Sequence, residues 1–246
     1  MRRDVDAAGR SSVGAARSVD ARPTFWLAMF AASCLGTNLG DFWVDELGVG
    51  RMLSFASLAF ICVPAVAADT QSGDRTEAFY WVAILALRAA ATNAADYLTH
   101  DIGLAYGGTA VALGVIALLL GSCTRPAPNG RGSPGVDGWY WAAMLAAGLM
   151  GTVAGDLASH TVGLFTAAAM LTLVLLIMLW LRSHAPVGVL GYWCAVLAER
   201  CAGTPVGDSL AGRHGLGLGL KLAMVCTGAF FSVALIIRRR LVSVSA

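Results

Sequence analysis

Four aspartates stand inside long apolar stretches of the chain, where an ionisable side chain is costly. They end the related segments GTNLGD, ATNAAD, GTVAGD and GTPVGD, so that each acid follows a threonine by four residues. A charged group in a membrane helix faces other helices or a watery cavity, because contact with lipid is unfavourable. Four such acids at one depth would form a ring that attracts cations. These four threonines and four aspartates are Thr37 and Asp41, Thr92 and Asp96, Thr152 and Asp156, and Thr204 and Asp208.

Two arginines occupy the same place relative to these acids. Arg88 and Arg200 precede Asp96 and Asp208 by eight residues, with a threonine midway. Eight helical residues amount to a net rotation of about 80°, so arginine, threonine and aspartate share one broad face. They also rise about 12 Å, so the arginine is too far away to pair simply with its own acid. We therefore expect each arginine to meet an acid from another helix or a bound water. Glu199 adds a fifth intramembrane acid, on a different face of its helix.

Further polar residues lie one helical turn beyond three of the acids, at Asp45, His100 and His160. If the helices continue that far, Asp96 with His100 and Asp156 with His160 form i, i+4 pairs that suit a divalent metal. Histidine also titrates near neutral pH and can relay protons. The alternative is that both histidines lie at the membrane interface and contact headgroups or water.

Sequence signals for an enzyme are absent. The chain contains no G-x-S-x-G, no H-E-x-x-H and no phosphate-binding G-x-x-x-x-G-K-[ST] motif. The glycine-rich run GLGLGLK at 215–221 lacks the preceding strand that a nucleotide-binding loop requires. The six cysteines form no C-x-x-C pair and lie mostly in apolar runs. We expect no enzymatic activity, no cofactor and no disulfide framework.

The composition predicts an integral membrane protein made of helices. Of 246 residues, 57% are hydrophobic and 13% charged, and the mean hydropathy is +0.70, which is too apolar for an ordinary soluble domain. Each apolar run is near the roughly 20 residues that a helix needs to cross a bilayer, and none alternates like a barrel strand. The eight expected spans are 25–43, 52–68, 79–98, 105–121, 139–157, 162–181, 187–210 and 216–237.

Charge predicts the orientation of these spans. With an even number of spans both termini lie on one side, together with loops 69–78, 122–138 and 182–187, and most arginines fall in these segments. The positive-inside rule therefore predicts a multi-pass membrane protein with both termini in the cytoplasm. The net charge of +2 reflects this topology and indicates no nucleic-acid partner. The other side holds only Arg51, Arg213 and Lys221.

The spacing around the acids also predicts internal repeats. A tryptophan precedes each acid by fifteen residues and a glycine follows it by seven, and the unit recurs every 52 to 60 residues. Each unit would hold two membrane helices, so the four units would be parallel and related by an axis along the membrane normal. With the tryptophans at the inner interface, the acids lie about 22 Å further out. The marker residues are Trp26, Trp81, Trp141 and Trp193, with Gly48, Gly103, Gly163 and Gly215.

This fourfold pattern resembles a bacterial family of membrane-anchored proteins built from four two-helix membrane repeats of unknown function. The resemblance covers residues 24–237 and implies an architecture without a chemistry. The first repeat of that family often carries a lysine and a glutamate, where this chain has Met29 and Thr37. The fourth repeat matches better, with Arg200 and Pro205 in the corresponding helix.

The predicted fold is therefore an all-α integral membrane protein with eight transmembrane helices arranged as four parallel two-helix repeats. The Arg-, Ser- and Ala-rich start of the chain and the Pro- and Gly-rich central segment are read as flexible pieces. The expected organisation is a disordered cytoplasmic tail (1–22), repeat 1 (23–68), repeat 2 (69–121), a cytoplasmic linker (122–138), repeat 3 (139–182), repeat 4 (183–238) and a second cytoplasmic tail (239–246).

Two functions remain open for this fold. The first is a cation or proton-coupled transporter that uses the four aspartates as its ion or proton site, with the arginines compensating their charge. The second is a membrane scaffold or sensor that transports nothing and whose GTxxGD motifs pack helices and form ion pairs. Small residues spaced by four let helices approach closely, as in Gly36 and Gly40, Ala91 and Ala95, Gly151 and Gly155, and Gly203 and Gly207. The expected partners are the lipid bilayer and a cation or proton.

Overall fold

The prediction of an all-α protein is confirmed. The computed structural model describes residues 17–19, 21–72, 76–127, 132–185, 188–212 and 215–244. In this part of the chain the backbone forms eight α-helices, two short π-helical turns and two strands of two residues each. The helices are α1 (Pro23–Asp41), α2 (Arg51–Ser72), α3 (Ala78–Asp96), α4 (Tyr106–Ser122), α5 (Gly138–Val162), α6 (Leu164–His184), α7 (Gly188–Ala211) and α8 (Leu220–Val244).

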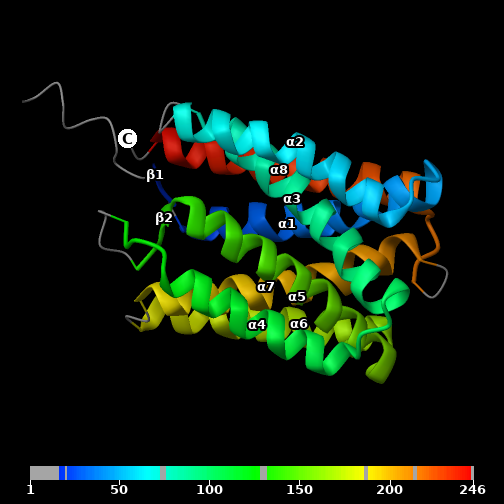
Figure 1. The fold of residues 1–246 in the computed structure, drawn as a ribbon. Helices are drawn as coiled ribbons and strands as arrows, with labels where there is room; N and C mark the ends of the chain where they lie inside the picture. The colour runs from blue at the N-terminus through cyan, green and yellow to red at the C-terminus, as the bar shows by residue number, and fades with distance from the viewer. Residues whose placement is uncertain are drawn as a thin grey trace, which may run out of the picture.

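Four of these helices form the centre of the molecule. Helices α1, α3, α5 and α7 all begin at the end of the bundle that carries the two strands, and they run in the same direction (Figure 1). Helix α1 packs against α3 and α7, and α5 packs against the same two helices, so the four close a ring. The other helices lie outside this ring: α2 packs on α3, α4 on α5, α6 on α7 and α8 on α1. Each of α2, α4 and α6 thus covers the inner helix that comes next in the chain. The last helix, α8, covers the first one, α1.

Glycines allow the inner helices to approach closely. A Cβ placed on Gly36 would lie 2.5 Å from Cγ of Arg88, and one on Gly40 would lie 2.9 Å from the carbonyl oxygen of Ala89. Between α5 and α7, a Cβ on Gly151 would lie 2.6 Å from the carbonyl carbon of Arg200. Real Cβ atoms are not found this close to other heavy atoms, so a larger residue would shift the Arg88 side chain at Gly36 and the neighbouring helix at Gly40 and Gly151.

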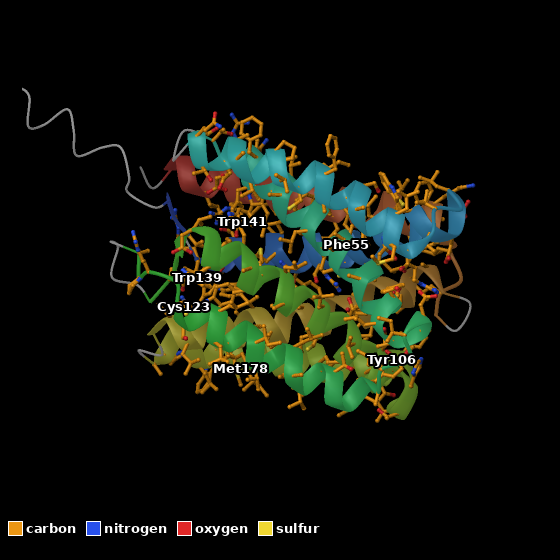
Figure 2. The ribbon with its side chains drawn as sticks, viewed as in Figure 1. Phe55, Tyr106, Cys123, Trp139, Trp141 and Met178 are labelled. Atoms are coloured by element: carbon orange, nitrogen blue, oxygen red, sulfur yellow. The ribbon has the colours of Figure 1, made fainter. Side chains whose placement is uncertain are left out.

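The four tryptophans, which we expected at the level of the inner membrane interface, are buried inside the bundle. Their side chains are between 1% and 8% exposed. The outer helices cover them: the ring of Trp193 lies against Gly121 of α4, and the ring of Trp81 is 6.0 Å from that of Phe231 in α8. Figure 2 shows Trp141 at the end of the bundle near Cys123 and the strands. The tryptophans therefore pack neighbouring helices together, and burial of their large rings contributes to the stability of the bundle.

The axis of the ring is closed at the same end by aromatic side chains. The residue before each tryptophan points toward the axis, and the hydroxyl oxygens of Tyr80 and Tyr140 are 2.6 Å apart, while those of Tyr140 and Tyr192 are 3.0 Å apart. Phe25 occupies the fourth place and contacts the rings of Tyr80 and Tyr192. One turn further along lies a second, fully buried apolar layer of Met29, Ile84, Met144 and Val196.

The strands order part of two segments that we expected to be flexible. Strand β1 (Arg17–Ser18) pairs antiparallel with β2 (Gly135–Val136), and an isolated bridge joins Pro126 to Pro134. The end of the expected tail 1–22 is therefore held against the end of the expected linker 122–138. Residues 1–16 and 128–131 of those segments lie outside the described residues. Helix α8 continues to Val244, into the expected tail 239–246.

Helix composition and exposed apolar surface indicate association with a membrane. Large apolar side chains are exposed on the outer helices, as at Phe60 (81%), Val111 (69%) and Val225 (67%). Contiguous apolar surface of this kind is unusual on a soluble protein. In the described part of the chain five helical segments are long and apolar enough to span a bilayer: Arg51–Ser72, Ala78–Asp101, Gly138–Val162, Leu164–His184 and Leu220–Leu241.

Candidate functional site

The four aspartates meet at one pocket, at the end of the ring opposite the strands. The pocket has a volume of about 230 Å³ and receives residues from all four inner helices. Each aspartate is half-buried, and the threonine one turn earlier on each inner helix is buried below it. Three further residues complete the lining. We call this cavity the acid pocket; it is lined by the four threonines, the four aspartates, His100, Tyr106 and His160.

Two of the inner helices change geometry directly after their acid. The α-helix ends at Asp41 in α1 and at Asp96 in α3, and each is followed by a five-residue π-helical turn, η1 (Phe42–Glu46) or η3 (Tyr97–Asp101). Helices α5 and α7 instead pass through their acids as regular α-helix. A π-helical turn widens the helix and is often found at functional sites. The mouth of the acid pocket is thus built differently on its α1–α3 side and its α5–α7 side.

Beneath the acid pocket lies the fully buried side chain of Arg88. Its guanidinium donates hydrogen bonds to the hydroxyls of Thr37 (2.9 Å), Thr92 (3.2 Å), Thr152 (2.7 Å) and Thr204 (2.7 Å). The acceptors therefore come from all four inner helices. Hydrogen bonds from a charged donor are stronger than neutral ones, so this cluster ties the ring together at one level. We call it the Arg88 hub.

Two other contacts complete the hub. Nε of Arg88 donates to Oγ of Ser33 at 3.0 Å, and Nη1 donates to the carbonyl oxygen of Gly148 at 3.4 Å. Ser33 and Gly148 each precede the aspartate of their helix by eight residues, and Arg88 has the same place relative to Asp96. The threonine hydroxyls remain free to donate to backbone carbonyls, as Thr37 does to Ser33 at 3.1 Å. Each threonine can thus accept from the guanidinium and donate to its helix at the same time.

Within the described part of the chain, neither arginine forms an ion pair with an acid from another helix, which was one of the two expected arrangements. Among the described residues Arg88 has no carboxylate within ion-pair distance, and Nε of Arg200 lies 3.4 Å from Oε2 of Glu199, its neighbour in α7. Both side chains of that pair are fully buried. Nη2 of Arg200 also approaches Sδ of Met144 at 3.7 Å. The two arginines therefore differ in their surroundings: Arg88 lies at the centre of the ring among the threonine hydroxyls, and Arg200 lies beside Glu199.

The rim of the acid pocket carries the two histidines and a tyrosine that we did not single out. Nδ1 of His100 is 3.9 Å from Oδ1 of Asp96, and Nε2 of His100 is 3.3 Å from the hydroxyl of Tyr106. The rings of Tyr106 and His160 are 5.4 Å apart and nearly perpendicular. Figure 2 shows Tyr106 at the end of the bundle away from Trp141. Tyr106 carries no sequence signal, because no other helix pair has a tyrosine at its position.

The metal site expected around His100, His160 and Asp45 has little geometric support. Asp45 is exposed in η1 and does not line the acid pocket. The π-helical turn moves it off the face that Asp41 occupies. Among the residues that the structure describes, no group of three His, Cys, Asp or Glu side chains is arranged to hold a metal ion.

Ion pairs near the mouth link the helix pairs on the outside of the pocket. Arg51 and Asp101 pair at 3.0 Å, and Lys221 and Glu46 pair at 2.9 Å. All four side chains are at least one-third exposed, so each pair contributes little to stability. They pair Asp101 and Glu46, two acids that lie outside the acid pocket.

No protein-family model matches the chain, and no curated protein or solved structure matches it either. The chemistry of the site therefore has to be judged from its geometry. The acid pocket offers carboxylates, imidazoles and hydroxyls on one side of the Arg88 hub, and a packed apolar axis lies on the other side. This arrangement suits the binding of a cation or proton from the open end.

Proposed function

We propose that the chain is a bacterial inner-membrane transporter for a cation, or one that is coupled to protons. In this proposal all eight helices span the membrane as four parallel two-helix repeats. The acid pocket binds the cation or proton, and the Arg88 hub with the apolar layers below it closes the pathway on the other side. The observation that carries the proposal is the convergence of the four aspartates on one open pocket.

Electrostatics supports a cationic ligand. The acid pocket holds four carboxylates, and the Arg88 guanidinium below it is engaged by hydroxyl and carbonyl oxygens. Carboxylates that line one cavity repel each other, and a bound cation or proton relieves this repulsion. Alternating access would then require the inner helices to move about the Arg88 hub, as parallel repeats move in other transporters.

Orientation in the membrane gives a first prediction. The end with the strands carries Arg182 and the consecutive arginines 238–240, whereas the acid pocket opens at the end with Arg51 and Lys221. We expect reporter fusions after residue 20, within 125–135 and after residue 238 to report the cytoplasm. Fusions near residues 46 and 101 should report the outside. A cytoplasmic signal at either of these two sites would contradict the eight-span arrangement.

The proposed transport is tested in proteoliposomes with a panel of protons and of monovalent and divalent cations. We expect the wild-type protein to raise the flux of at least one of them above that of protein-free vesicles. Asp208→Asn should lower this flux at least about tenfold, which corresponds to about 1.4 kcal/mol, because the amide keeps the shape but removes the charge. Asp45→Asn is the matched control, since Asp45 is exposed and lies outside the pocket.

The apparent melting temperature of each variant must accompany the flux measurement. A lower flux with an unchanged melting temperature supports a binding role for Asp208. An identical passive leak with and without protein for every ion would reject transport. An equal loss of flux in Asp45→Asn would show that the effect is not specific to the acid pocket.

The Arg88 hub favours a second candidate function. Its hydrogen bonds reach all four inner helices, which is what a rigid membrane scaffold or sensor requires. In such a protein the aspartates would stabilise the ring and bind nothing. Replacement of an aspartate by asparagine would then lower the melting temperature, and no ion would be transported by the wild-type protein.

A further inference from the structure

A second cavity lies on the side of the bundle, remote from the acid pocket. It is an open groove of about 530 Å³ between α1 and α6, near the end that carries the strands. Its walls are mainly apolar: Leu27 and Phe30 come from α1, and Leu175, Leu176 and Leu179 come from α6. No part of the proposed transport uses it. We call it the Arg182 groove, after the basic residue at its end.

The length of the groove matches one leaflet of a bilayer. Its lining on α6 extends over twelve residues, from Thr172 to Ser183, and the eleven steps between them rise about 16 Å along a helix. Half of a hydrocarbon core of about 30 Å is about 15 Å. An extended acyl chain can therefore lie along the leucines of α6 with its polar end at the level of Ser183.

The polar end of the groove presents a cation with donors available to a ligand. The guanidinium carbon of Arg182 lies 5.8 Å from the ring centre of Trp26 and 5.4 Å from that of Tyr192, so two aromatic faces hold it in place. Its hydrogen bonds to two backbone carbonyls and to Ser133 are long, between 3.4 and 3.5 Å. A phosphate oxygen offers a shorter, charge-assisted bond to the same group.

We propose that the Arg182 groove binds a phospholipid with an anionic headgroup, with an acyl chain between α1 and α6 and the phosphate at Arg182. The apolar groove has the length of one leaflet and suits an acyl chain, and the arginine at its polar end suits an anionic headgroup. A lipid with a zwitterionic headgroup would gain the same apolar contacts, but its own positive charge would be brought close to the guanidinium. This proposal depends on association with a membrane and is independent of the transport proposal.

The test measures lipid binding by native mass spectrometry of the purified protein in a neutral detergent. Dioleoyl phosphatidylglycerol and dioleoyl phosphatidylcholine are titrated separately, with inorganic phosphate as a headgroup control. We expect the anionic lipid to bind at least about fivefold more tightly, the effect of one basic residue near an anionic lipid surface. Arg182→Gln should remove this preference, and Arg239→Gln, which changes an exposed arginine of α8 at the same end, should keep it.

A second variant tests the apolar part of the groove. Leu176 is 58% exposed on the wall, so Leu176→Trp should fill the groove without disturbing the core and weaken the binding of both lipids. This variant remains informative if Arg182→Gln lowers the yield. Equal affinity of the wild-type protein for both lipids would overturn the proposal. So would an equal loss of preference in Arg239→Gln, or unchanged binding in Leu176→Trp.

Discussion

Replacement of Arg88 by alanine is expected to lower the apparent melting temperature of the detergent-solubilised protein by about 6–12 °C. The change removes a buried guanidinium that donates to side chains of all four inner helices and leaves a cavity at the ring centre. Loss of charge-assisted hydrogen bonds and creation of a cavity together cost about 3 kcal/mol, and each kcal/mol shifts the melting temperature by about 2–4 °C in a protein of this size.

Arg88→Met separates the two contributions to this effect. Methionine fills much of the arginine volume but forms none of its hydrogen bonds, while the threonine hydroxyls can still donate to carbonyls of their own helices, as Thr37 and Thr204 do. We expect its melting temperature to lie between those of Arg88→Ala and the wild-type protein. Arg239→Ala, at an exposed position of α8, is the control. Wild-type melting of Arg88→Ala would contradict the structural role of the hub.

Replacement of Gly151 by leucine is expected to prevent assembly of the bundle. A Cβ at this position would lie 2.6 Å from the carbonyl carbon and 2.8 Å from the carbonyl oxygen of Arg200. A backbone carbonyl in α7 cannot rotate away as a side chain can, so α5 and α7 must separate, which breaks the ring that holds the Arg88 hub. We expect little or no monodisperse protein in size-exclusion chromatography after detergent extraction.

The control for this experiment is Gly108→Leu. Gly108 lies in α4, and a Cβ there would have no atom within 4 Å. The added leucine should therefore be tolerated, and helix propensity alone favours it over glycine. Similar yields of monodisperse protein from Gly151→Leu and Gly108→Leu would contradict the close packing of α5 and α7.

The arrangement of apolar runs in the chain was sufficient to predict an all-helical protein and to place most of its helices. The spacing of threonine and aspartate, four residues apart on each inner helix, also singled out the eight residues that supply most of the lining of the acid pocket. A helix of 3.6 residues per turn puts such residues on one face, so the local sequence already decides which side chains can meet. The small-residue spacing likewise indicated where the helices approach each other, as at Gly36 and Gly40.

The tertiary structure decided which partner each of these side chains has. Arg88 and Arg200 occupy equivalent positions in the sequence, but the guanidinium of Arg88 lies at the centre and meets hydroxyls of four helices, whereas that of Arg200 lies beside Glu199. Tryptophan as a residue type is common at membrane interfaces, but which helices cover these four side chains was decided by the tertiary structure, in which outer helices bury them. Spacing along one helix does not specify which helix lies next to it, so the Arg88 hub, the position of Tyr106 at the pocket rim and the Arg182 groove depend on contacts between segments far apart in the chain.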